Sequence, residues 1–255
     1  MIVAVKILKD DIEYRPTFDQ EIQLLKKLQD HANVIKLIGV ISEPSYCCTV
    51  TELMRQDLLN YLQEWPEGSN DTVEQLDRSL VTFALHVTRA MEYLKHQQVV
   101  HRDIAARNIL ISFDDVAKIA DFGLSRDVYQ KGQYQRHPTG GMLVPVRWMA
   151  PEALSAGVYS HESDIWSYGV LLWEMATRGD TPYPEFRSLE PAFLVQKLTM
   201  GHRMSKPRHC TEDIYGLMRH CWNNNPEERI SPSGLVNNIS RFEKFNKGMF
   251  FKAGQ

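Results

Sequence analysis

The sequence predicts an α+β protein with two lobes, a small β-rich lobe followed by a larger, mostly helical one. Residues 1–8 and 34–51 are rich in β-branched side chains and indicate strands, and residues 17–28 carry apolar side chains at helical spacing. The polar stretch 66–72 predicts a surface loop. Beyond it the helical spacing recurs between turns that contain Pro and Gly, and helices are predicted over 79–96, 162–177, 191–200 and 213–222.

Composition narrows the class of protein. The chain has 255 residues, 43% hydrophobic and 24% charged, which is enough to bury a sizeable core. Its net charge of -3 gives no reason to expect nucleic acid or an anionic membrane as partner. The 4 cysteines lack metal-ligand spacing, and we expect them to be buried thiols. The apolar runs 2–8 and 168–176, the second interrupted by Glu174, are too short to span a membrane, and no signal peptide is expected.

The most specific motif is H-R-D-I-A-A-R-N at 101–108, which resembles the catalytic loop H-R-D-x-x-x-x-N of protein kinases. Its spacing suits phosphoryl transfer. Asp103 is the candidate to accept or orient the proton of a substrate hydroxyl, and Asn108 is the candidate to hold magnesium against nucleotide phosphates. A polar loop that matches the pattern by chance is the alternative.

Two further motifs follow in the order that this resemblance requires. Asp121-Phe122-Gly123 comes after the strand-like residues 116–120, and its aspartate is the expected second magnesium ligand. Ala150-Pro151-Glu152 then occupies the position of the A-P-E motif. D-F-G alone is a common turn sequence, but three ordered motifs argue against coincidence.

Near the start of the chain, residues 3–6 read V-A-V-K and resemble the kinase strand V-A-I-K. The lysine of that strand contacts the α- and β-phosphates and pairs with a glutamate on a helix. Glu21, on the predicted helix of the small lobe, is the candidate partner of Lys6. Taken alone, Lys6 would be a solvated lysine on an edge strand; the companion motifs favour the nucleotide-binding role.

Residues 1 to about 245 thus resemble a protein kinase domain that lacks its first two strands. Serine/threonine kinases usually carry a lysine two places after the catalytic aspartate. Here that place is taken by Ala105, and Arg107 follows, in the Ala-Ala-Arg form typical of receptor tyrosine kinases. The resemblance therefore implies tyrosine as the acceptor, with Arg107 among the catalytic residues.

A second tyrosine-kinase feature lies at 145–149, where P-V-R-W-M resembles the substrate shelf with Pro145 and Trp148. In the family, this proline packs against the substrate phenol ring and sets the depth at which its hydroxyl meets the aspartate. The segment 201–207 is similar to the fibroblast growth factor receptor branch and its neighbours.

The resemblance also implies two structural roles. Asp164, in S-D-I-W-S-Y-G at 163–169, corresponds to the aspartate of the central helix that holds the backbone of the catalytic loop. Arg229 corresponds to the arginine that pairs with the glutamate of A-P-E, here Glu152. We expect that pair to be buried and intolerant of the removal of either partner.

Regulation is expected in the polar segment between Gly123 and Ala150, where Tyr129 and Tyr134 are candidate autophosphorylation sites. A phosphate there could pair with Arg102 and order the loop. Either tyrosine could equally be a plain surface residue.

The adenine of ATP is expected at the connection between the lobes, with Thr51 as gatekeeper and the backbone groups of Glu52 and Met54 as hydrogen-bonding partners. The family's apolar stack through both lobes corresponds to four residues, each of which could also be ordinary core: Leu25, Leu37, His101 and Phe122.

The sequence departs from the family pattern most clearly at the phosphate-covering loop G-x-G-x-x-G. No glycine precedes Lys6, and the first one in the chain is Gly39. We therefore expect an exposed sheet edge in the small lobe and an incomplete roof over the nucleotide. Smaller departures are Arg55-Gln56-Asp57 at the edge of the ribose pocket and Ile230 in place of a proline.

These observations predict a protein-tyrosine kinase that uses ATP with Mg²⁺, or alternatively Mn²⁺, and phosphorylates protein tyrosines, its own activation loop included. Expected partners are phosphotyrosine-binding adaptor domains and a second copy for trans-phosphorylation, but no nucleic acid. We expect the kinase domain over 1–245, with lobes 1–54 and 55–245 and a tail at 246–255, on the cytoplasmic side of the plasma membrane within a receptor. The alternative is a catalytically impaired scaffold that presents phosphotyrosines.

Overall fold

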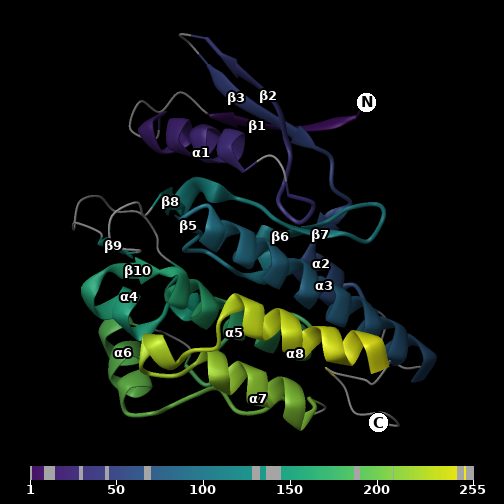
Figure 1. Ribbon diagram of the computed structural model, residues 1–255, viewed down its shortest axis with the longest axis vertical. Coiled ribbons are helices and arrows are strands. Elements are labelled where there is room, and N and C mark those ends of the chain that lie inside the picture. The colour runs from purple at the N-terminus through teal and green to yellow at the C-terminus, as the bar shows by residue number, and fades with distance from the viewer. Residues whose placement is uncertain are drawn as a thin grey trace.

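The computed structural model describes residues 2–8, 15–28, 31–43, 46–65, 70–127, 133–135, 145–186, 190–208, 210–245 and 250. The chain folds into two lobes, with a small sheet and one helix above a larger helical body (Figure 1). The predicted α+β, two-lobed fold class is confirmed.

The small lobe is a three-stranded antiparallel sheet in the order β1 (Val3–Leu8), β3 (Cys47–Glu52) and β2 (Leu37–Ser42). Helix α1 (Arg15–Lys27) covers one face, where its buried Phe18 and Ile22 pack against Cys47. In the described part of the chain β1 pairs with β3 alone, so it is an edge strand. Two of its side chains, Val5 and Ile7, are 51% and 60% exposed.

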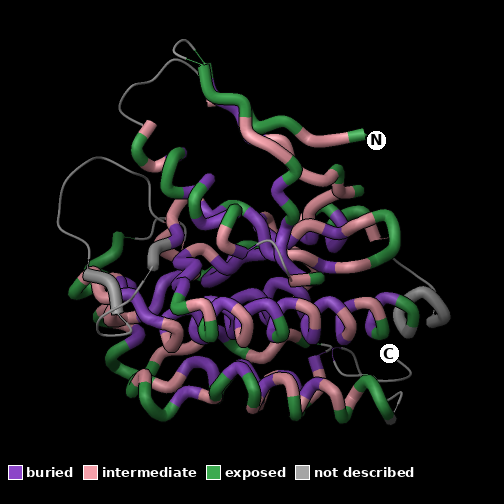
Figure 2. Tube along the Cα trace, turned by 45° about the horizontal axis from the view of Figure 1, so that its top comes forward, coloured by how far each residue is buried: buried purple, intermediate pink, exposed green. Residues whose placement is uncertain are grey.

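The larger lobe is built around one helix, α5 (His161–Ala176), whose residues from 163 onward are all buried. A helix that is apolar on every side belongs in the interior, and Figure 1 shows α5 enclosed by its neighbours. The tube coloured by burial shows the same interior (Figure 2). The other helices are α2 (Leu58–Gln63), α3 (Asn70–His96), α4 (Pro151–Ala156), α6 (Pro191–Thr199), α7 (Glu212–Cys221) and α8 (Pro232–Phe245).

The loop predicted over 66–72 is wrong at its end, because α3 begins at Asn70. Asn, Asp and Thr lower helix propensity but do not break a helix, and no Gly or Pro interrupts residues 70–96. Polar composition in this stretch was therefore a poor sign of a loop. Residues 66–69 lie outside the described residues.

Short strands at the junction of the lobes position the loops of the site. A three-stranded sheet has the order β4 (Gln56–Asp57), β6 (Ile109–Ile111) and β7 (Ala117–Ile119). Strand β5 (Val99–Val100) pairs with β8 (Arg126–Asp127), and β9 (Gln133–Gln135) pairs with β10 (Val158–Ser160). Single 3-10 turns are η1 (Ala106–Asn108), η2 (Phe122–Leu124), η3 (Val146–Trp148) and η4 (Pro226–Glu228).

Paired strands hold both ends of each loop that carries a candidate catalytic residue. The H-R-D loop leaves β5 and enters η1 and β6, while the D-F-G segment leaves β7 and runs into β8. Because β6 pairs with β7 and β5 with β8, the two segments lie side by side. The fold thus brings Asp103 and Asp121, which lie on two different loops, together at the junction of the lobes.

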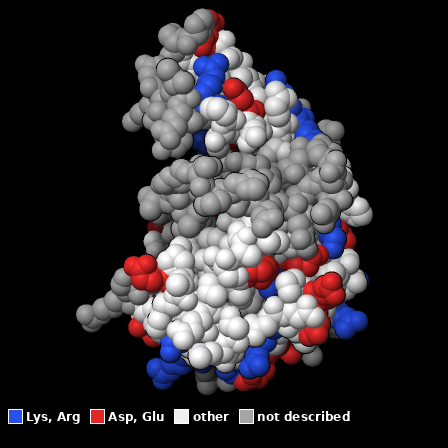
Figure 3. Space-filling view, turned by 90° about the vertical axis from the view of Figure 1, so that its left-hand side faces the viewer, with Lys and Arg blue, Asp and Glu red and all other residues white. Residues whose placement is uncertain are grey.

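The expectation about the cysteines is confirmed. All four cysteines are buried free thiols. Lys, Arg, Asp and Glu side chains are interspersed over the larger lobe on the face drawn in Figure 3. None of the helices in the described ranges is both long and apolar enough to cross a bilayer. The predicted tail lies outside the described residues except for Phe250, which is fully buried and donates its N–H to Asp77 Oδ1 at 2.6 Å.

Candidate active site

The H-R-D loop is held from below by Asp164 of α5. The two carboxylate oxygens of Asp164 accept the backbone N–H groups of His101 and Arg102 at 2.7 and 2.8 Å. Arg102 has a φ of 73°, a left-handed conformation that costs free energy in a residue with a side chain. The two hydrogen bonds stabilise this turn. Burial raises the pKa of Asp164 to about 7, and the two N–H donors oppose that rise.

Asp103 is clamped by two neighbours in its own loop. Arg107 Nη2 donates to Asp103 Oδ1, and Asn108 Nδ2 donates to Oδ2 at 2.7 Å and to the Asp103 carbonyl at 2.8 Å. His101 accepts the Asp103 N–H at Nδ1, and its Nε2 lies 3.1 Å from the Ala120 carbonyl, which places the ring proton on Nε2. Burial raises the pKa of Asp103, and the charge of Arg107 and the hydrogen bond from Asn108 partly offset the rise. The carboxylate side chain is 12% exposed and fixed in direction.

Lys6 bridges two acids that come from different lobes. Its Nζ donates to both oxygens of Glu21, at 2.8 and 2.9 Å, and lies 3.3 Å from Asp121 Oδ1. Burial lowers the pKa of Lys6, but the carboxylates of Asp121 and Glu21 outweigh burial and raise it. Lys6 in turn holds the pKa of Asp121 below its ordinary value, whereas burial keeps that of Glu21 raised. The ammonium group is therefore charged and aimed at the junction.

Asp121 adopts a left-handed backbone conformation with φ of 58°, which turns the following Phe122 inward. The Phe122 ring is 1% exposed and meets the His101 ring edge-on, with centroids 5.0 Å apart. The other two residues of the predicted stack, Leu25 and Leu37, are buried in the same apolar core. The contact between Phe122 and His101 joins the two loops of the site, and the core that contains Phe122 also contains Leu25 of α1 and Leu37 of β2.

Two oxygen donors in the site suit a hard divalent cation. Asn108 directs both of its described amide donations toward Asp103, so that its Oδ1 is the atom that could bind a metal, and the Asp121 side chain is 53% exposed. Carboxylate and amide oxygens are the protein ligands that Mg²⁺ prefers, with phosphate and water completing the shell. Within the described ranges no group of three His, Cys, Asp or Glu side chains could hold a metal.

The candidate adenine site begins at Thr51, in the central strand opposite Ala4 and Leu37. The side chain of Glu52 is engaged by Lys118 of β7, whose Nζ donates to its two oxygens at 2.7 and 2.9 Å. The backbone N–H of Glu52 donates to the Lys36 carbonyl at 3.2 Å. Lys118, which sequence reasoning missed, therefore ties the connection between the lobes to the strand that precedes Asp121.

The candidate shelf contacts the catalytic loop at Arg107. The Arg107 guanidinium lies over the Trp148 ring, 4.4 Å from its centroid, and so contacts the shelf and Asp103 at the same time. Pro145 caps the η3 turn that carries Trp148. Sequence reasoning missed Arg147, which donates to three carbonyls of the segment after α5, those of Pro182, Tyr183 and Phe186.

With this geometry in place, comparison with known proteins decides the family. A sequence model described as protein tyrosine and serine/threonine kinase matches residues 1–239. The chain belongs to this family of protein kinases. It is also 39% identical over 251 residues to fibroblast growth factor receptor 1 of Xenopus laevis and 41% identical over 253 residues to that of Pleurodeles waltl. Each match covers 94% of this chain and 30% of the relative, so the chain spans about a third of those proteins' length.

These matches confirm the predicted resemblance to the fibroblast growth factor receptor branch. As a member of a kinase family, the protein is expected to use ATP and a divalent metal in general. The two relatives are receptors by name, and the whole-protein activity is taken up below as a proposal.

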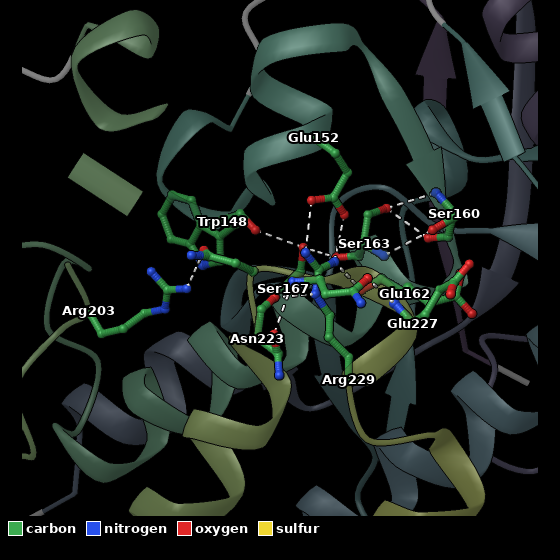
Figure 4. A network of polar contacts seen from close by, with 12 residues as sticks. Trp148, Glu152, Ser160, Glu162, Ser163, Ser167, Arg203, Asn223, Glu227 and Arg229 are labelled. Atoms are coloured by element: carbon green, nitrogen blue, oxygen red, sulfur yellow. Dashed lines mark hydrogen bonds and ion pairs between the residues drawn. The ribbon is translucent and has the colours of Figure 1, made fainter. Parts of the chain in front are cut away.

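The kinase domain also contains the expected ion pair at the base of the larger lobe. Arg229 Nη1 and Nη2 donate to the two oxygens of Glu152 at 2.6 and 2.8 Å, in a bidentate arrangement. Further donations reach the carbonyls of Glu162 and Asn223. Figure 4 shows these contacts beside the Ser160–Ser163 capping box that begins α5. The Arg229 side chain is fully buried and that of Glu152 is 21% exposed.

The candidate phosphorylation sites of the kinase domain are only partly described. Tyr129 lies outside the described residues. The backbone of Tyr134 lies on β9, opposite Tyr159 of β10. The Arg102 guanidinium lies over the Tyr159 ring, 4.0 Å from its centroid. Arg102, the residue expected to pair with a phosphate on this loop, thus contacts the strand that pairs with β9.

Proposed function

We propose that this kinase domain transfers the γ-phosphoryl group of ATP to tyrosine hydroxyls of proteins. The observation that carries the proposal is the position of Arg107, which donates to Asp103 and stacks on Trp148 of the shelf. The family includes enzymes for tyrosine and for serine or threonine. An arginine that joins the base to the shelf supports the tyrosine acceptor, because the shelf is the surface that would support a phenol ring.

In this proposal Asp103 orients the substrate hydroxyl and accepts its proton. Arg107 and Asn108 hold the two carboxylate oxygens, so that little reorganisation is needed when the hydroxyl arrives. Partial burial raises the pKa of Asp103 toward the range of a useful base. Pro145 and Trp148 would set the depth of the phenol ring, and a serine side chain would not reach Asp103 from the same support.

ATP with Mg²⁺, when bound, supplies the phosphoryl group and neutralises its developing charge. Asn108 and Asp121 would hold the metal, with Mn²⁺ as an alternative ion. Lys6, kept in place by Glu21, would contact the α- and β-phosphates. The adenine would meet Thr51, the carbonyl of Glu52, whose N–H is already donated to Lys36, and the backbone of Met54.

The names of the two relatives suggest where in the cell this domain would work. The relatives carry the name of receptors for a growth factor. We propose that this domain likewise works on the cytoplasmic side of the plasma membrane within a receptor. A second copy would phosphorylate Tyr129 and Tyr134 in trans, and the resulting phosphotyrosines would recruit adaptor domains.

The test measures transfer of labelled γ-phosphate from Mg-ATP to paired peptides that differ only in Tyr or Ser at one position. It uses this chain and a version extended upstream in its gene through the next G-x-G-x-x-G. Tyrosine labelling by either form supports the proposal. Labelling of serine at an equal rate contradicts the assigned acceptor, and no labelling by either form favours the non-catalytic scaffold that presents phosphotyrosines.

A further inference from the structure

Glu174 is a buried acid that the mechanism above does not use. It lies in the last turn of α5, is 2% exposed, and interrupts an otherwise apolar run. Burying a carboxyl group costs free energy unless hydrogen bonds satisfy it. Its partners therefore indicate why the chain has an acid at this position.

A single oxygen of Glu174 joins two segments of the candidate active site. Glu174 Oε2 accepts the backbone N–H of Ala106 at 3.0 Å and the indole N–H of Trp148 at 2.9 Å. Ala106 begins the η1 turn between Asp103 and Asn108. Trp148 ends the η3 turn of the shelf. The catalytic loop and the shelf are thus linked through one atom on the central helix.

The two linked segments meet again on the side of the substrate. Arg107, next to Ala106, lies over the ring of Trp148 and donates to Asp103. Trp148 is also fixed through its backbone, because Ser167 Oγ donates to its carbonyl at 2.8 Å, as Figure 4 shows. With the backbone held by Ser167 and the indole N–H by Glu174, the ring has a defined plane on which Arg107 can lie.

We propose that Glu174 is a positioning residue that sets the Trp148 ring and the Ala106 turn in register, and thereby places Arg107 and Asp103 relative to the substrate tyrosine. This inference rests on the proposed function. The relevant property is the hydrogen-bond acceptor at the end of α5. Burial raises the pKa of Glu174 to about 7, while Trp148, Ala106 and Arg107 oppose the rise and Asp103 adds to it.

The acceptor can be separated from the charge by substitution. Glu174→Gln keeps a side-chain oxygen that both N–H groups can reach, whereas Glu174→Met keeps the volume and loses the acceptor. Glu162→Gln, at the first turn of the same helix, is the matched control, because that side chain is partly exposed and pairs with Lys95 at 3.6 Å. Each variant is assayed for kcat and KM with the tyrosine peptide and for KM with ATP.

We expect Glu174→Met to lower kcat for the tyrosine peptide by between about 10-fold and about 100-fold, the loss typical of a misplaced catalytic group, with KM for ATP unchanged. Glu174→Gln should retain most of the activity, and Glu162→Gln should match the unmodified kinase. A kcat for Glu174→Met equal to that of the control overturns the proposal. So does a rise in KM for ATP in proportion to the loss of kcat, since the defect would then reach the nucleotide site and not be confined to the groups that face the tyrosine.

A second variant covers the case in which Glu174→Met does not fold. Trp148→Phe removes the indole N–H and leaves an aromatic ring for Arg107. It should lower kcat for the tyrosine peptide in the same direction, with KM for ATP unchanged. A kcat for Trp148→Phe equal to that of the unmodified kinase overturns the proposal.

One readout does not depend on phosphoryl transfer. In protein labelled with ¹⁵N at tryptophan, the indole N–H resonance of Trp148 is assigned by its loss in Trp148→Phe. Its proton shift should move upfield in Glu174→Met, as expected for a broken hydrogen bond. If the unmodified kinase does not label tyrosine, the proposed function fails while this shift still tests the contact. An unchanged shift overturns the link between Glu174 and Trp148.

Discussion

Gly169 of α5 lies directly against the indole ring of Trp222, which follows α7. A Cβ at Gly169 would lie 2.6 Å from Trp222 Nε1 and 2.7 Å from the Cβ of Cys221, closer than side-chain atoms pack. Both Trp222 and Cys221 are buried, so neither can move into solvent. The central helix therefore approaches α7 only because this position has no side chain.

We predict that Gly169→Ala destabilises the domain by about 1–3 kcal/mol, the cost of overpacking a filled core. Equilibrium unfolding in urea measures the change. Gly216→Ala in α7 is the matched control, because a Cβ there meets nothing within 4 Å and alanine favours a helix interior. Equal stability of the two variants would contradict the close packing of α5 on α7.

The ion pair between the fully buried Arg229 and the partly exposed Glu152 gives a second prediction. Glu152→Gln leaves the fully buried guanidinium without its bidentate carboxylate, and we expect a loss of about 3 kcal/mol in the free energy of unfolding. Arg55→Gln tests an ion pair of similar length, 2.7 Å to Asp115, whose partners are 32% and 66% exposed. That change should cost at most about 1 kcal/mol. Similar losses in the two variants would show that burial does not set the strength of these pairs.

Much of this site could be predicted from sequence, because its residues belong to motifs of fixed spacing. Lys6, Asp103 and Asp121 each lie in a short string whose neighbours are equally diagnostic. Glu174 and Lys118 were missed because they occur outside such strings, and their partners lie elsewhere in the chain. Glu174 did leave a signal, since a lone acid inside an apolar helical run must find hydrogen-bond donors.

The pairing of Lys6 with Glu21 predicts a specific loss of activity. Glu21→Gln removes the negative charge that holds Lys6 Nζ. Asp121 would then be the remaining carboxylate of this site that attracts Nζ, and Lys6 would move away from its position beside α1. We expect kcat to fall by about 100-fold, as for other misplaced catalytic groups, with the free energy of unfolding little changed. Asp19→Asn, on the same helix in an exposed pair with Arg15, should leave kcat unchanged. A kcat for Glu21→Gln near that of Asp19→Asn would contradict the role of the pair.

A prediction of pH dependence follows from His86. Its Nδ1 accepts the Ala117 N–H at 3.2 Å, and burial, followed by the charge of Arg89, lowers its pKa to about 4. The unfolded chain binds a proton at His86 below about pH 6.5, whereas the folded chain does not until about pH 4. This histidine therefore makes the free energy of unfolding decrease as the pH falls from about 6.5 to about 4.

His86→Gln keeps an acceptor for Ala117 but does not titrate. Unfolding in urea at several pH values should show a shallower decrease for this variant than for the unmodified domain. Other groups titrate in both proteins, so the difference between the two curves isolates His86. Parallel curves would contradict a neutral, half-buried His86.

The most direct test of the account is turnover of a tyrosine peptide by Asp103→Asn with Mg-ATP, alongside nucleotide affinity measured in the same protein. Loss of the base should lower kcat by about 100-fold or more, while the affinity for nucleotide stays unchanged because Lys6, Asn108 and Asp121 remain. Turnover close to that of the unmodified kinase would contradict the central claim that Asp103 accepts the proton of the substrate tyrosine.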